Sequence, residues 1–160
     1  MKTHGQSVVF NFLGYLISFL ILPAFFASSA WAENKDLAKH FNAGNEYTLK
    51  KDFQKAIKSY QKALKIDKTV AVIHYALANA YLDGATGPTT EADFQKAVKE
   101  YQAAIDLNPN IPDFHRNLGY AYALLKRGDL AKKKYDELLK TSPSHAEELK
   151  DWIKRSNEKK

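Results

Sequence analysis

Apolar and small residues recur along this chain at helical spacings, in two alternating patterns. In the first pattern, a histidine is followed by apolar or small residues at three and four positions and by a tyrosine at seven. It occurs three times: His40, Ala43, Gly44 and Tyr47; His74, Leu77, Ala78 and Tyr81; His115, Leu118, Gly119 and Tyr122. The second pattern also occurs three times: Ala56, Tyr60 and Ala63; Ala97, Tyr101 and Ala104; Ala131, Tyr135 and Leu138. Residues at these spacings share one face of a helix, so the sequence predicts three pairs of amphipathic helices.

Both patterns have the same period. The first recurs after 34 and then 41 residues, and the second recurs after 41 and then 34. The basic period is therefore 34 residues, and seven extra residues lie between Tyr81 and Phe94. This interval contains the stretch DGATGPTTEAD, whose Gly, Pro and Thr residues predict a longer turn capped by Thr89 or Thr90.

The two patterns together resemble the tetratricopeptide repeat over roughly Leu37 to His145, with His in place of the usual Trp and Tyr in place of Phe. The resemblance implies an all-α fold, a right-handed superhelical solenoid of antiparallel helix pairs. We predict three repeats, at 37–70, 71–111 and 112–145. A single helix pair cannot bury its apolar face alone, so we expect the three pairs to stack into one continuous core.

A further helix is predicted at 146–160. The sequence Ser144-x-x-Glu147 has the form of a capping box that opens a helix. Its apolar stripe is formed by Ala146, Leu149, Trp152 and Ile153. A terminal helix of this kind covers the exposed face of the last repeat. No such helix is predicted before the first repeat, which leaves open whether its outer edge is covered by a partner, by self-association or by nothing.

The N-terminal residues 1–32 have the features of an export signal. Lys2 precedes an apolar run from Val8 to Phe26, and Ala30 and Ala32 form the small-residue pattern of a cleavage site. We therefore expect an exported protein, periplasmic or secreted. The alternative is an uncleaved inner-membrane anchor, because the apolar run approaches the ~20 residues that span a bilayer.

Composition narrows the possible functions. The chain has no cysteine, which excludes disulfides, thiol catalysis and cysteine-ligated zinc. It has neither a G-x-S-x-G motif nor a phosphate-binding glycine loop, so we predict no catalytic residue, no cofactor and no enzymatic activity. Lys132, Lys133 and Lys134 form a basic cluster. The export signal argues against nucleic acid as a partner and leaves a weak contact with an anionic membrane surface.

The three aligned histidines His40, His74 and His115 suggest either a metal site or a packing role. Adjacent ones would lie ~10 Å apart, the spacing of packed helices, whereas zinc ligands lie ~2 Å from their ion. We therefore predict no metal site and interpret the histidines as packing residues.

The resemblance also implies where a ligand would bind, because the first helices of such repeats line a concave groove. A stripe next to the packing stripe of each first helix contains Phe41, Asn45 and Thr48; Val72, Tyr75, Asn79 and Leu82; Asp113, Arg116 and Tyr120. Rings beside amides suit an extended peptide. The alternative for Phe41 and Tyr75 is that they only fill the inside of the superhelix.

One subtype of peptide site is not expected. Family members that clamp a C-terminal carboxylate use Lys, Asn, Asn, Lys and Arg. The corresponding residues here are Phe41, Asn45, Ala76, Asp113 and Asn117, of which only Asn45 matches. The predicted function is a non-enzymatic protein-interaction scaffold that binds a protein or peptide segment. The alternative is a membrane-anchored structural subunit of an envelope complex.

Overall fold

The described residues of this computed structural model, 35–86 and 90–158, form seven α-helices and no strand. The first helix spans 35–49. It is followed by α2 (Phe53–Ile66), α3 (Ala71–Asp83), α4 (Thr90–Leu107), α5 (Pro112–Leu124), α6 (Gly128–Thr141) and α7 (Pro143–Glu158). The predicted signal or anchor at 1–32 lies outside the described residues. Within them, no helix is both long and apolar enough to cross a bilayer.

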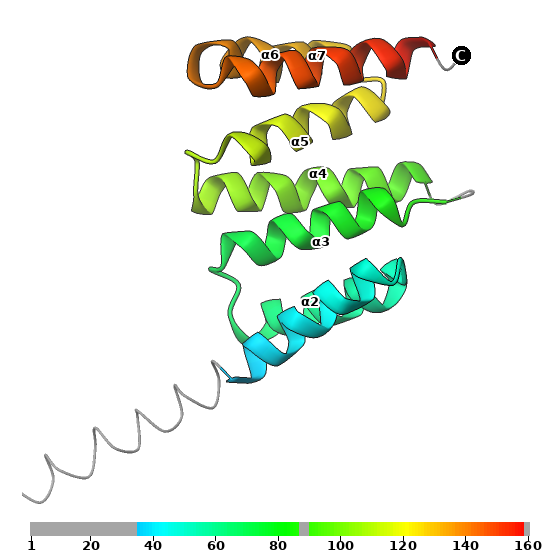
Figure 1. Cartoon of the computed structure of the whole chain (residues 1–160), viewed down its shortest axis with the longest axis vertical. Helices are drawn as coiled ribbons and strands as arrows, with labels where there is room; N and C mark the ends of the chain where they lie inside the picture. Colours follow the sequence, from blue (N-terminus) through cyan, green and yellow to red (C-terminus); the bar gives the residue numbers. More distant parts are fainter. Residues whose placement is uncertain (1–34, 87–89, 159–160) are drawn as a thin grey trace, which may run out of the picture. The chain divides into compact units, whose positions relative to one another are not determined.

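From α2 onward, each helix packs against the next, and α5 also packs against α7 (Figure 1). Both sequence patterns supply the core between them. The fully buried side chains include Leu77 and Leu118 from the first pattern and Tyr101 and Leu138 from the second. The predicted all-α architecture is confirmed, and the helical spacing of the two patterns is what places these side chains on the inner faces.

Small residues allow two of the helix contacts to be close. A Cβ atom on Gly44 would lie 2.4 Å from the ring of Tyr60, and one on Gly119 would lie 2.5 Å from Leu149. A Cβ atom at either position would force the neighbouring side chain to shift, so glycine there lets the neighbouring helix approach closely.

The seven extra residues are not all in a turn. Thr90 is the first residue of α4, which has 18 residues, whereas α2 and α6 have 14 each. Four of the extra residues therefore lengthen a helix. Of the two predicted caps, Thr89 or Thr90, Thr90 lies inside the helix. Glu91 and Asp93 in the first turn favour the helix, because carboxylates interact well with its positive N-terminal end. Thr89 lies outside the described residues.

The last helix begins at Pro143, three residues earlier than the sequence predicts. Proline is favoured at the first helical position, where its missing N–H costs nothing. Ser144 therefore lies inside the first turn, and the expected Ser144–Glu147 capping box does not open the helix. Instead Ser142 precedes Pro143, and its carbonyl accepts a hydrogen bond from the Ala146 amide at 3.2 Å.

The α7 helix packs on α5 and α6 through Ala146 and Leu149, both buried. Trp152 does not share this burial, although it belongs to the predicted apolar stripe. It is 44% exposed. The expectation that it packs with Leu149 is wrong, because it lies at the border of the stripe, beside Tyr120 of α5.

Candidate functional site

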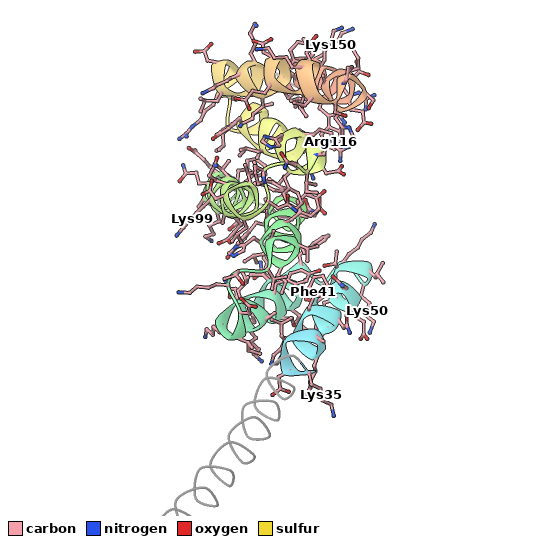
Figure 2. All side chains as sticks on the ribbon, turned by 90° about the vertical axis from the view of Figure 1, so that its left-hand side faces the viewer. Lys35, Phe41, Lys50, Lys99, Arg116 and Lys150 are labelled. Carbon is pink, nitrogen blue, oxygen red and sulfur yellow. The ribbon has the colours of Figure 1, made fainter. Side chains whose placement is uncertain are left out.

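The stripe predicted to face a ligand lies along the helix 35–49, α3 and α5. Nine of its side chains are half-buried: Phe41, Asn45, Thr48, Tyr75, Asn79, Leu82, Asp113, Arg116 and Tyr120. Val72 is exposed. We call these ten side chains, together with Asp83, Asn117, Glu148 and Trp152, the first-helix face. Arg116 on this face and Lys99 of α4 lie on opposite sides of the stack (Figure 2).

Tyrosines of the second helices orient two asparagines of the face. The Tyr60 hydroxyl donates a hydrogen bond to Asn45 Oδ1 at 2.8 Å, and the Tyr101 hydroxyl donates one to Asn79 Oδ1. The two pairs occupy equivalent positions in successive repeats. Tyrosine in place of phenylalanine therefore changes the polar contacts of this chain, because each added hydroxyl binds one asparagine side chain.

Asn117 completes this arrangement on α5. Its Nδ2 donates to the Tyr75 hydroxyl at 3.0 Å and to Asn79 Oδ1 at 3.1 Å. The Asn79 carbonyl oxygen thus accepts two hydrogen bonds, from Tyr101 and Asn117. Among the described residues, its amide nitrogen has no protein partner and is not buried. The Asn79 amide is therefore held with its N–H groups available to a ligand.

Aromatic rings surround these amides. Tyr75 packs against Phe114, with ring centroids 4.8 Å apart, and against Tyr101 at 5.8 Å. Tyr120 meets Trp152 of α7 edge-on at 3.9 Å. Phe41 and Tyr75 pack against the core while remaining half-buried. They fill space inside the stack and still present part of each ring.

Arg116 is the single cation of the predicted stripe, and its guanidinium already has partners within the protein. Arg116 forms ion pairs with Asp113 and Glu148, each at 2.6 Å, and its Nε donates to Asn117 Oδ1 at 3.2 Å. His145 Nε2 lies 3.6 Å from the same Asp113 carboxylate. A ligand carboxylate would have to displace these contacts to reach the guanidinium.

Burial changes the acid–base behaviour of the face. It raises the pKa of the Tyr101 hydroxyl well above 10.0, with Tyr75 and Asp83 adding to the rise. It also raises the pKa of Tyr120, and again the charge of Asp83 contributes. Partial burial raises the pKa of the Asp83 carboxyl itself above 3.8.

The histidines join successive repeats. His74 Nε2 donates to the Lys68 carbonyl at 3.0 Å, and His115 Nε2 donates to the Pro109 carbonyl at 2.7 Å. His74 Nδ1 also lies 2.7 Å from Glu100 Oε2. In the described part of the chain, no three His, Asp or Glu side chains come together in a way that could hold a metal ion.

Sequence reasoning missed four residues of the face: Asp83, Asn117, Glu148 and Trp152 as a face residue. Asn117 follows His115 by two positions, outside the stripe that was considered. Glu148 and Trp152 reach the face from α7, which was interpreted only as a cap. The tyrosine-for-phenylalanine replacement at Tyr60 and Tyr101 was the one available signal that the second helices reach this face.

Comparisons with known proteins identify the repeats and the fold. The family model described as TPR repeat matches residues 44–84 and 93–126. Among solved structures, the TPR domain of Arabidopsis OM64 is 19% identical, with a TM-score of 0.66, covering 77% of this chain and 98% of its own. The second TPR domain of human RPAP3, solved in complex with the HSP70 peptide SGPTIEEVD, is 21% identical, with a TM-score of 0.66 over 76% of this chain and 98% of its own.

A third structure is the first TPR of Spaghetti (RPAP3), bound to the HSP90 peptide SRMEEVD. It is 23% identical, with a TM-score of 0.64, covering 76% of this chain and 93% of its own. At these identities the likeness shows the fold, a helical solenoid. No curated protein matches the sequence.

Proposed function

Because the chain carries tetratricopeptide repeats, we propose that it is a non-enzymatic interaction module whose first-helix face binds an extended segment of another protein. The observation that supports this most directly is the orientation of Asn79. Its carbonyl oxygen is occupied by Tyr101 and Asn117, and its N–H groups have no partner among the described residues, so they remain free to donate to a ligand. An extended peptide offers backbone carbonyls that such a donor can bind.

The geometry reduces the cost of binding. A side chain that is already held loses little conformational freedom when a ligand arrives, and Asn45 is held in the same way as Asn79 one repeat earlier. Exposed ring surface of Tyr75 and Tyr120 beside these donors supplies apolar area. The two RPAP3 domains with similar folds bind short peptides, which supports the peptide class.

Asn79→Asp tests this proposal. The substitution keeps an oxygen for Tyr101 and Asn117 but replaces the outward N–H donor by an acceptor, so peptide affinity should fall at least tenfold. The partner is first isolated from envelope extract with the full chain, and its dissociation constant is then measured for each variant. Lys99→Ala on the opposite side is the matched control. If Asn79→Asp binds like wild type while charge reversal of Lys132–Lys134 abolishes capture, the first-helix face is the wrong surface.

The domain organisation we propose is three repeats followed by a cap. The helices α3 and α5 begin at Ala71 and Pro112, the positions where the second and third repeats are expected to start. The α7 helix buries Ala146 and Leu149, which supports its role as the cap. Truncation after Ser142 should then expose apolar surface of α5 and α6 and cause aggregation, measured by light scattering.

We further propose export, on the basis of the N-terminal sequence. Residues 1–32 would be removed and the domain released to the periplasm or the medium. Sequencing the N-terminus of the protein recovered from cells is the test. Glu33 as the first residue supports release, whereas an intact Met1 supports the second candidate, a membrane-anchored structural subunit that uses Val8–Phe26 as its anchor.

A further inference from the structure

The positive charge of this protein is unevenly distributed. Residues 35–68 contain nine lysines and four carboxylates, whereas residues 69–158 contain twelve Lys or Arg and thirteen Asp or Glu. The net charge of +6 of the whole chain is therefore a property of the first repeat and the termini. Around α3, α5 and α7 the chain has no excess of positive charge, so its overall composition gives no reason to expect an acidic ligand there.

On the first-helix face itself, negative charge dominates. Three carboxylates, Asp83, Asp113 and Glu148, accompany a single cation, Arg116. That guanidinium already contacts two of the carboxylates at 2.6 Å. Further along α7, Asp151 and Arg155 add one charge of each sign. The carboxylate left over is Asp83, since no cation among the described residues pairs with it.

The position of Asp83 is unfavourable for the isolated protein. It is the last residue of α3, where the negative end of the helix dipole opposes a carboxylate. Partial burial adds to this cost, as the raised pKa of its carboxyl indicates. The carboxylate is nevertheless exposed enough to meet another molecule. A ligand cation would relieve both the repulsion and the lack of a partner.

Asp83 also lies on the same side of α3 as the oriented amide. Asn79 precedes it by four residues and Tyr75 by eight, so the three side chains form one row along the helix. On α5, Tyr120 of the same face packs against Trp152 with ring centroids 3.9 Å apart, and its pKa is raised by burial and by the charge of Asp83. Aromatic faces within ~6 Å attract Lys and Arg side chains as well. A basic side chain beside Asp83 would therefore find both a carboxylate and a ring.

We infer that the first-helix face takes a basic extended segment, with a Lys or Arg side chain of the partner paired to Asp83 beside Tyr120 while the neighbouring peptide carbonyl accepts from Asn79. This inference rests on the proposed peptide-binding function and specifies its ligand class. It separates this chain from the acidic-tail ligands of the RPAP3 domains, because Arg116 is neutralised where an acidic tail would need a free cation.

The test is selection from a display library of random nonapeptides on the immobilised full chain. Wild type should enrich sequences with Lys or Arg at one position and deplete Asp and Glu there. Asp83→Asn, which keeps the shape and removes the charge, should abolish that preference and weaken the best recovered peptide at least tenfold by fluorescence anisotropy. Asp106→Asn, an exposed carboxylate near the end of α4, is the matched control and should leave both unchanged.

The outcomes separate the two proposals. Enriched peptides that are acidic or show no basic preference, yet lose affinity with Asn79→Asp, would overturn the ligand class and leave the peptide-binding function standing. Enrichment of no sequence, or recovered peptides that bind wild type and Asn79→Asp equally, would overturn both. A basic preference that survives Asp83→Asn would show that another carboxylate binds the cation and that the assignment to Asp83 is wrong.

Discussion

At the scale of single residues, the defining feature is a polar network in which tyrosines of the second helices bind asparagines of the first-helix face. Tyr60 and Tyr101 each add one hydroxyl to an otherwise apolar position, and each hydroxyl orients an asparagine. A buried polar group is costly when it has no partner and nearly neutral when it has one. The network therefore costs little stability while fixing the direction in which Asn45 and Asn79 donate.

The buried hydroxyl of Tyr101 predicts a loss of stability in alkali. The pKa of Tyr101 in the folded protein is raised well above 10.0 by burial, whereas in the unfolded chain it is ordinary. Below about pH 10 both states keep the proton, and above it only the unfolded state loses it, so folding becomes less favourable as pH rises. We expect the urea midpoint to fall between pH 8 and pH 11, and to fall less in Tyr101→Phe. An equal fall in both proteins would contradict this account.

Among the described residues no cation pairs with the Asp83 carboxylate, so we predict that a substitution there can stabilise the free protein. Removing the charge in Asp83→Asn ends its repulsion with the C-terminal end of α3, an effect of about 0.3–1 kcal/mol at low ionic strength and less in salt. The thermal midpoint of the ligand-free variant should rise. Asp106→Asn serves for comparison, and a lower midpoint for Asp83→Asn would indicate that the carboxylate has a partner.

At the scale of helices, α7 has two roles on two faces. One face carries Ala146 and Leu149 into the stack, and the adjoining one brings Glu148 to Arg116 and Trp152 to Tyr120. Residues of α7 thus also belong to the first-helix face. The register of the helix makes this possible, because Glu148 and Trp152 are four residues apart and share one side.

Leu149→Ala should destabilise the protein much more than Trp152→Ala. Leu149 is 1% exposed and fills the space above Gly119, so its truncation leaves a cavity and should cost about 2–5 kcal/mol. Trp152 is 44% exposed, and its truncation should cost far less. Urea denaturation of both variants measures the difference. A larger loss for Trp152→Ala would mean that the indole, rather than Leu149, anchors α7.

At the scale of the whole molecule, stability should vary along the stack. Among the helices α2 to α7, each of α3, α4 and α5 packs against a helix on both sides. The first repeat carries an excess of lysines, and Leu49 within it is 85% exposed. Charge repulsion and incomplete cover both favour local opening of this end.

Hydrogen exchange should therefore be faster in residues 35–66 than in α3 to α5. Peptide-level mass spectrometry of the full chain under native conditions provides the measurement. Equal protection at the two places would mean that the N-terminal edge is covered, by a second copy or by a partner. Repeating the experiment over a hundredfold range of protein concentration distinguishes a second copy, because only self-association depends on it.

Much of the fold followed from local spacing. The 34-residue period predicts helix pairs that begin at 71 and 112, and helices begin there because the same spacing both forms each helix and creates its contact with the next. Glycines at 44 and 119 of the first pattern lie where a side chain of the neighbouring helix approaches closely. The start of α7 and the extension of α4 were missed, since proline and carboxylates at a first turn act through end effects that periodicity does not contain.

For the candidate site, the contributions of the sequence and of the tertiary structure are different. The sequence by itself predicted which stripe of each first helix lies beside the packing stripe, and its availability to a ligand stays a prediction. Only the tertiary structure decided what that stripe can bind. Asn117 reaches Tyr75 and Asn79 across 42 and 38 residues, and Arg116 reaches Glu148 across 32. Hydrogen bonds over such separations determine which end of an amide side chain points outward and which cation is free to bind a ligand. Both properties depend on distances between helices. The spacing of residues within one helix does not specify those distances.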